Sequence, residues 1–311
     1  MTVMEWLLAA DPAIRWQVMR DLSGAAPGVV AAERARVASE GWGAELLALQ
    51  DPGGAWDGGT YRPGWVDDSK PFFDAWTATH FVLHDLRDLG LDPESPEARD
   101  AVSLVRENVR WRANDAGYFQ GETEPCVNGT ALATAAYFGQ GGHGMVERLV
   151  DQQLDDGGWN CWAAHGAKVA SFHTTICVVE GLAAWERAGG SAETADIRRR
   201  GEEYLLERGL FRTRSTAQVA DPRFTMFSYP TRWYHDVLRG LEHFRSVGAT
   251  VDDRCAEAIG LVAGKRDPEG RWPLENSHQG PTHLEMEGPD GFPSRWNTLR
   301  AMRVLRWAGV D

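Results

Sequence analysis

A Gly-rich turn that ends on an aromatic residue recurs along this chain. It reads GGAW at 53–56, AGYF at 116–119, GGW at 157–159 and EGRW at 269–272. Between these turns apolar residues recur at helical spacing, and strand patterns are almost absent. A unit of helix, turn and helix that repeats in this way indicates hairpins that bury their apolar faces against neighbouring hairpins.

Six helix starts resemble one another and define the repeat. Short turns follow the helices that begin there, and long loops follow the helices in between. We therefore predict an all-α toroid in which six inner helices alternate with outer ones, with all long loops at one end. The leading N-terminal segment helps to close the ring, and residues 1–311 form one domain. The inner helices are expected at about 12–22, 74–89, 125–138, 171–188, 231–247 and 294–308, and the outer ones at about 29–49, 97–113, 144–154, 192–208 and 251–264.

Composition excludes several classes of partner. The net charge of -13 disfavours nucleic acid and acidic membrane surfaces, which both need basic patches. No apolar run approaches the length of a membrane span, and the N-terminus lacks the basic region of a signal peptide. The four cysteines are far apart and form no CxxC pair, so a disulfide framework is not expected. We expect a soluble cytoplasmic protein.

Several stretches resemble a known superfamily. QDPGGAW (50–56) and QQLDDGGW (152–159) look like the repeats of squalene and oxidosqualene cyclases. AGYFQG with VNGTALA, and later SFHTTICVVEGL, are similar to the zinc-bearing inner helices of protein prenyltransferase β subunits. The resemblance to these α/α toroids implies their fold from about residue 12 to 308.

The catalytic residues of those relatives transfer poorly. The nearest match to the DxDD acid motif of the cyclases is Asp67 and Asp68, which lacks the spaced first Asp. Of the three zinc-ligand positions of the prenyltransferases, only His173 matches, and the other two fall on Asn128 and Thr130. The positions that grip a diphosphate fall on Glu122 and Pro125, so protein prenylation is not expected.

The aligned helix starts place a ring of polar side chains at one level. Such a ring above an apolar barrel suits a mostly apolar ligand with one polar end. The alternative is that these residues cap helices and bond to neighbouring loops. The ring consists of Gln17, Thr77, Asn128, His173, Tyr234 and Asn297.

Histidines and carboxylates converge on the same end, and their pKa values are open to shifts in a buried mouth. The alternative for any one of them is a hydrogen-bonded structural residue. Our candidates for proton transfer are His173, Glu124, His235, Asp236, His283 and Glu285, with His80 nearby as a ligand contact.

Aromatic residues gather at the helix starts and in the loops above them. Their faces can line an apolar site or stabilise a cation. The alternative is that tryptophans at repeated positions wedge neighbouring hairpins together, which we favour for those at the helix starts. The candidate contacts are Trp159, Trp162, Trp233, Trp296 and Phe172.

No cofactor is expected, with zinc as an alternative. Glu124, Cys126, Cys161, His165 and His173 lie near two adjacent inner-helix starts and offer the ligand types that zinc takes. No compact motif is present, because Cys161-x3-His165 has weak spacing, and both cysteines also suit apolar packing.

Together these features favour an enzyme that acts by acid–base chemistry on a terpenoid-like or polycyclic small molecule. A cyclase or an isomerase fits the resemblance, and the central cavity is expected to be apolar with one polar end. Two alternatives remain: a non-catalytic protein that binds or sequesters a hydrophobic metabolite, and a zinc-dependent hydrolase or transferase. The sequence does not predict an oligomeric state.

Overall fold

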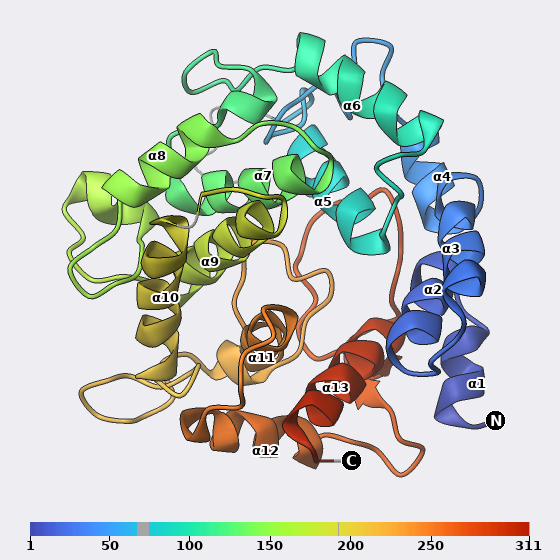
Figure 1. Ribbon diagram of the computed structural model, residues 1–311, viewed down its shortest axis with the longest axis vertical. Helices are drawn as coiled ribbons and strands as arrows, with labels where there is room; N and C mark the ends of the chain where they lie inside the picture. The colour runs from blue at the N-terminus through green and yellow to red at the C-terminus, as the bar shows by residue number, and fades with distance from the viewer. Residues whose placement is uncertain (67–74, 192, 311) are drawn as a thin grey trace.

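The computed structural model, which describes residues 1–66, 75–191 and 193–310, is a closed ring of helices. Inner helices surround a central axis and outer helices cover them (Figure 1), so the predicted all-α toroid is confirmed. The inner helices are α2 (Pro12–Asp21), α5 (Thr79–Leu89), α7 (Pro125–Tyr137), α9 (Phe172–Arg187), α11 (Val237–Ser246) and α13 (Arg295–Ala308).

The outer layer is built from the helices that lie between the inner ones in the chain. Within the described part of the chain the only paired strands are β1 (Trp272–Pro273) and β2 (Pro293–Ser294), an antiparallel pair. The outer helices are α1 (Val3–Leu8), α3 (Pro27–Ala35), α4 (Gly41–Ala48), α6 (Pro96–Asn108), α8 (His143–Asp151), α10 (Glu193–Leu206) and α12 (Ala256–Gly264). Short 3₁₀ helices are η1 (Arg36–Ala38), η2 (Tyr118–Gln120), η3 (Cys161–His165), η4 (Pro222–Thr225) and η5 (Asp253–Cys255).

The repeated tryptophan explains why the hairpins stack in one register. In three turns its backbone N–H donates to a threonine hydroxyl in the first turn of the following inner helix, and its indole N–H donates to a carbonyl of the preceding outer helix. Each tryptophan therefore joins two helices by hydrogen bonds while its ring fills the space between them. The triplets of tryptophan, threonine and carbonyl are Trp56, Thr79 and Leu46 (3.1 and 2.7 Å), Trp159, Thr175 and Leu149 (3.1 and 2.7 Å), and Trp272, Thr298 and Val262 (3.0 and 2.6 Å).

A glutamine anchors two of these turns to the next outer helix. The Gln153 amide donates to the carbonyls of Gly157 in its own turn and Ile197 in α10, at 2.7 and 2.8 Å. Gln50 makes the same pair of bonds to Gly54 and to α6. The repeated Q…GG…W pattern is thus a set of contacts between successive hairpins.

Two inner helices begin later than the sequence predicts. α5 starts at Thr79 and α11 at Val237, so Trp76 and Trp233 lie in the preceding loops. α11 starts where Asp236 caps it by accepting the Arg239 N–H at 2.8 Å. Thr79, Thr175 and Thr298 occupy equivalent positions in the repeat. Asn297 lies one residue before Thr298, whereas His173 lies two residues before Thr175. The residues of the predicted polar ring are therefore not at equivalent positions.

The outer segment 29–49, predicted as one helix, is α3, η1 and α4. The helical path breaks at Gly41, whose φ of +64° lies in the left-handed region.

The N-terminal helices close the ring against the last inner helix, as predicted. Arg303 of α13 donates to the Gln17 amide oxygen at 2.7 Å and pairs with Asp21. Arg306 donates to the backbone carbonyls of Asp21 and Leu22 at the end of α2. Within the described residues, none of the helices is both long and apolar enough to span a membrane.

Candidate functional site

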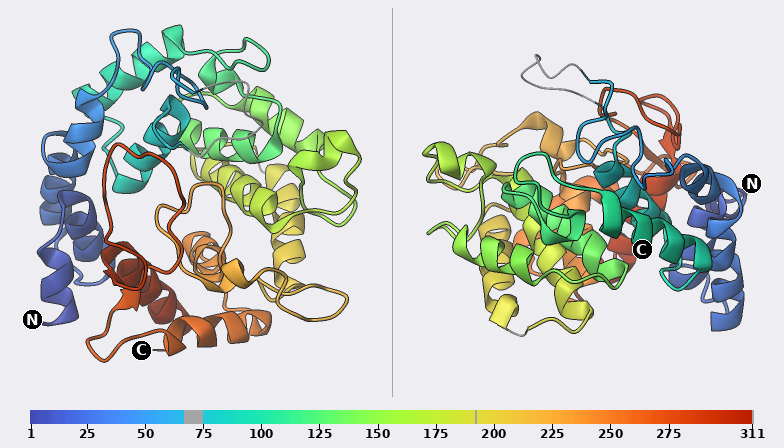
Figure 2. Two further views of the ribbon diagram at one scale, coloured as in Figure 1. Left: turned by 180° about the vertical axis from the view of Figure 1, so that it is seen from behind. Right: turned by 90° about the horizontal axis from the view of Figure 1, so that it is seen from above.

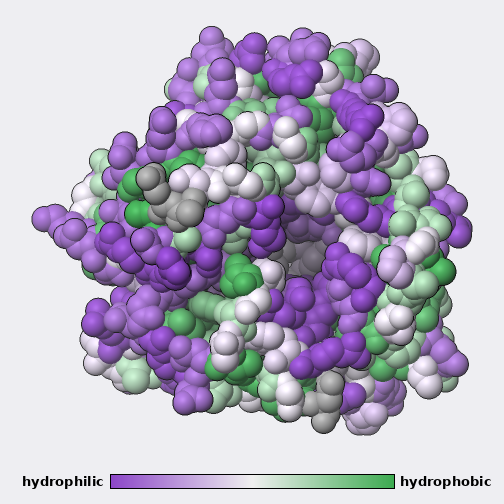
Figure 3. All heavy atoms as spheres, viewed as in Figure 1, coloured by the Kyte–Doolittle hydropathy of each residue, from purple (hydrophilic) through white to green (hydrophobic). Residues whose placement is uncertain are grey.

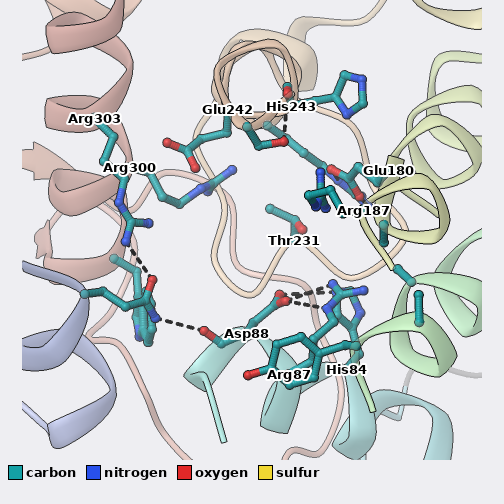
Figure 4. Close-up of a pocket in the computed structure, with 18 of the residues that line it drawn as sticks. His84, Arg87, Asp88, Glu180, Arg187, Thr231, Glu242, His243, Arg300 and Arg303 are labelled. Atoms are coloured by element: carbon teal, nitrogen blue, oxygen red, sulfur yellow. Dashed lines mark hydrogen bonds and ion pairs between the residues drawn. The ribbon is translucent and has the colours of Figure 1, made fainter. Parts of the chain in front are cut away.

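A large cavity lies on the ring axis at the end that carries the short turns, opposite the long loops. Its volume is about 460 Å³, which is within the range of small-molecule sites. Figure 3 shows this end of the molecule, with a central hollow surrounded by hydrophilic residues. The second half of each inner helix contributes to its wall, and Figure 4 shows the side chains.

The wall of the cavity is charged, which differs from the expected apolar lining. It carries five arginines and three carboxylates, so positive charge exceeds negative charge in a chain whose net charge is -13. Small apolar residues of α7 and α9 fill the wall between them. The charged residues are Arg87, Arg187, Arg239, Arg300, Arg303, Asp88, Glu180 and Glu242.

Three of the arginines are neutralised by neighbours within the protein. Arg239 forms a two-point ion pair with Glu180, at 2.9 and 2.6 Å. Arg303 pairs with Asp21 behind the wall, and Arg87 with Asp88. These pairs stiffen the cavity and leave little net charge of their own.

The other two arginines face the cavity without a carboxylate. Arg300 donates to the Ser228 carbonyl at 3.0 Å and to the Asn297 side-chain oxygen at 3.1 Å, and none of the described carboxylates lies within ion-pairing distance of it. Arg187 makes no hydrogen bond or ion pair with any described residue. Desolvation of its guanidinium group, together with the nearby Arg87 and Arg198, lowers the pKa of Arg187, although Glu180 and Glu186 act in the opposite direction.

A histidine–carboxylate pair forms another part of the wall. His84 Nε2 lies 3.2 Å from an Asp88 carboxylate oxygen, one helical turn away on α5. Burial lowers the pKa of His84. Burial alone would raise the pKa of Asp88, but Arg87 and His84 lower it by more. An imidazole that is neutral near pH 7 and oriented by a carboxylate is suited to accept a proton.

The loop end of the axis, where we expected the ligand, is filled by packed rings. Tyr234 stacks between Trp233 and His278, with ring centroids 3.8 and 4.0 Å apart, and His173 packs edge-on against Trp233 and Tyr234. Arg232 forms a buried ion pair with Asp85, in which one guanidinium nitrogen donates to both carboxylate oxygens at 2.9 Å. The adjoining cavity beside Tyr61, His80 and Trp233 encloses only about 10 Å³. We call this set of rings the aromatic plug: Trp76, His173, Trp233, Tyr234 and His278.

Most predicted proton-transfer residues therefore lie away from the large cavity. His173 Nδ1 accepts the His235 backbone N–H at 2.8 Å, and His235 Nε2 lies 2.6 Å from the Leu210 carbonyl. Asp236 caps α11 and also accepts the Ser228 hydroxyl. Among the rest, His283 bonds the Thr77 carbonyl, Glu285 is exposed, and Glu124 occupies the N-cap position of α7 without a side-chain capping bond.

Of the predicted ligand contacts, Gln17 and Trp296 line the cavity. The others do not line this cavity. Asn128 bonds both backbone groups of Glu122, at 2.8 and 2.7 Å, and Asn297 bonds Pro273. His80 meets the Tyr118 hydroxyl, Phe172 stacks on His235, Trp159 is fully buried in the repeat, and Trp162 and His165 are exposed in η3.

The sequence analysis missed the charged wall, although a signal was present. In α5, His84, Arg87 and Asp88 recur at i, i+3 and i+4. That spacing marks one helix face, and on an inner helix it is the face toward the axis. The predicted site residues lie mostly at the helix starts and in the loops, at the other end of the axis.

Comparisons with known proteins find similar folds only. Family models give no match to this sequence, and no curated protein matches it. A protein from Actinoplanes is 16% identical with a TM-score of 0.47, covering 96% of this chain and 90% of that chain. An apo variant of the type II terpene cyclase MstE from Scytonema is 17% identical with a TM-score of 0.42, covering 97% and 86%. A second MstE variant, in complex with geranylgeranyl dihydroxybenzoate, is 16% identical with a TM-score of 0.41, covering 97% and 87%.

Proposed function

We propose that this protein binds a small anionic molecule, bearing a phosphate or carboxylate group, in its central cavity. The observation that supports this is the pair Arg187 and Arg300, two guanidinium groups without a carboxylate partner on the wall of a 460 Å³ cavity. Arg300 is buried, and a bound anion would compensate its positive charge where none of the described carboxylates does. Arg187 is exposed at the same cavity wall, where it supplies a second guanidinium group. Guanidinium groups also match phosphate and carboxylate oxygens in two-point hydrogen bonds.

The proposal is tested by titrating the protein with inorganic diphosphate and measuring heat and melting temperature. We expect saturable binding that raises the melting temperature and weakens with added salt. Arg187→Gln or Arg300→Gln is expected to lower the affinity at least tenfold, or about 1.4 kcal/mol each. Arg199→Gln, an exposed arginine on the outer helix α10, is the matched control and is expected to bind as the parent does.

Two results would contradict the proposal. One is that the parent protein binds neither inorganic diphosphate nor citrate. The other is that Arg187→Gln and Arg300→Gln, both folded, bind diphosphate as tightly as Arg199→Gln.

A second candidate is catalysis on a terpenoid-like ligand, as an isomerase or a cyclase. It is favoured by the stack of Tyr229 on Trp296 in the cavity wall, with centroids 4.5 Å apart, together with the His84–Asp88 pair. The ring faces offer an apolar surface for a hydrocarbon chain. The lowered pKa of His84 suits proton abstraction better than the proton donation that begins an acid-initiated cyclisation, so we favour the isomerase.

Incubation with geranylgeranyl diphosphate separates binding from catalysis. An isomerase is expected to yield a product of unchanged mass and changed chromatographic retention, and His84→Gln should abolish it while leaving diphosphate affinity intact. Tight binding with no product over many hours would favour a binding or sequestering protein instead.

A further inference from the structure

Two cysteines from different elements meet at the loop end of the ring. Cys126 lies in the first turn of α7 and Cys161 begins η3, and their Sγ atoms are 2.6 Å apart. Glu124, the N-cap residue of α7, places a carboxylate oxygen 3.8 Å from the Cys126 Sγ. One ligand atom from each of the three residues lies within 4.8 Å of the others.

The three groups place two sulfur atoms and a carboxylate in one small space, and the Cys126 thiol lies within hydrogen-bond distance of both other groups. None of the three has a basic partner within ion-pairing distance in the described part of the chain. A divalent cation among them would stabilise two thiolates and a carboxylate together.

We propose that Glu124, Cys126 and Cys161 bind one thiophilic divalent cation of the zinc class. Binding deprotonates both thiols: two sulfur–metal bonds and one oxygen–metal bond form, and two protons pass to solvent. A water molecule, or His165 from the end of η3, completes a tetrahedral set of S, O and N ligands.

The local structure allows the cation to enter. Zinc–sulfur bonds of about 2.3 Å place two tetrahedral thiolates roughly 3.7 Å apart, so the sulfur atoms must separate by about 1 Å. Cys161 is half-buried on a five-residue 3₁₀ helix in the α8–α9 loop and can supply that movement. The Thr174 hydroxyl donates to Cys161 Sγ at 3.4 Å, which orients this ligand from behind.

This site differs from the zinc positions that the sequence resemblance implies. Those positions are already occupied by internal hydrogen bonds. The Asn128 amide bonds the Glu122 backbone, the Thr130 hydroxyl donates to the Cys126 carbonyl at 3.2 Å, and His173 Nδ1 accepts the His235 N–H. The three proposed ligands lie one turn nearer the loops and join the α8–α9 loop to the start of α7.

The full-length protein tests the proposal after treatment with a reductant and a chelator that are then removed. Zinc is titrated in competition with a chromophoric chelator, and cobalt(II) serves as a spectroscopic probe. We expect one zinc per chain and a thiolate-to-cobalt charge-transfer band. Cys126→Ser and Cys161→Ser should each weaken zinc binding at least 100-fold, and Glu124→Gln about tenfold. Cys255→Ser, at a buried cysteine in η5, is the matched control and should bind as the parent does.

Three outcomes would overturn the proposal. The first is no zinc binding by the reduced parent protein. The second is zinc binding that persists in Cys161→Ser. Cys161 is half-buried, so this variant is expected to fold and decides the matter if Cys126→Ser does not fold. The third is that the pair forms a disulfide in air, shown by peptide mapping, while the reduced protein binds no metal, which would make it a redox pair.

Discussion

Four histidines at the loop end are held neutral by burial. Burial lowers the pKa of His80 and His173 to about 3, and that of His235 and His278 to about 4. Each packs against aromatic rings, where an imidazolium ion would lose its hydration without gaining a carboxylate. These side chains support the fold more directly than they support chemistry.

The lowered pKa values predict acid sensitivity. The unfolded chain binds protons at these histidines near pH 6.5, and the folded protein binds them only near pH 3 to 4. Their contribution to the free energy of unfolding is therefore complete above pH 6.5. It is lost as the pH falls from 6.5 toward the folded-state pKa values, by about 1.4 kcal/mol per pH unit for each histidine. We expect urea unfolding between pH 6.5 and 4.5 to show this slope.

His80→Asn tests the assignment, because asparagine retains an acceptor near the Tyr118 hydroxyl. In this variant the change in unfolding free energy with pH is expected to be smaller by about 1.4 kcal/mol per pH unit, which is the contribution of one histidine. His165→Asn, at an exposed site in η3, is the control and should retain it. An unchanged slope in His80→Asn would show that this histidine does not contribute.

At the scale of elements, the turn before each tryptophan depends on a glycine that touches the next outer helix. Gly157 has φ of +90°, and a Cβ there would lie 2.7 Å from the Arg200 carbonyl oxygen of α10. Gly54 and Gly270 also have positive φ at the matching position of their turns. The glycine thus allows both the turn and the close approach of two hairpins.

Gly157→Ala is expected to destabilise the protein by roughly 3 kcal/mol or more, since it adds a backbone clash to the strain of an alanine at positive φ. Gly166→Ala is a matched control, because Gly166 has φ of +97° but nothing within 4 Å of its added Cβ. That control is expected to cost only about 1 kcal/mol. Equal losses in chemical denaturation would show that the contact with α10 is unimportant.

At the scale of the whole molecule, the ring is closed by contacts between its first and last inner helices (Figure 2). Arg306 donates to the carbonyls of Asp21 and Leu22 at 2.6 and 3.1 Å, and these groups otherwise lack partners at the end of α2. The residues involved are about 285 positions apart.

Arg306→Ala is expected to lower the free energy of unfolding by about 1–2 kcal/mol, because it leaves helix-end carbonyls without a charged donor. The unfolding transition should remain single when followed by both tryptophan fluorescence and circular dichroism. Arg199→Ala removes an exposed ion pair on α10 and is expected to change stability by less than about 0.5 kcal/mol. A loss in Arg306→Ala no larger than in this control would assign ring closure to the apolar contacts alone.

The toroid was predictable from the sequence because its repeat is local. Trp56, Trp159 and Trp272 each lie within ten residues of the carbonyl that accepts their indole proton, and helical spacing marks the hairpins between them. Residues such as Asn128 and Asp236 also act locally, as loop anchor and helix cap. The sequence therefore predicted the architecture, the order of the helices and the end that carries the long loops.

Only the tertiary structure decided which end of the axis is open. The aromatic plug brings together Trp76 and His278 from two loops and His173 from the start of α9, all far apart in sequence. It fills the mouth that we expected to hold the ligand. At the other end Arg187 and Arg300 come from different helices, and neither forms an ion pair with a described carboxylate because of where the ring places those carboxylates. Spacing along a chain identifies the face that a side chain occupies, whereas cavity shape and charge balance depend on all six inner helices at once.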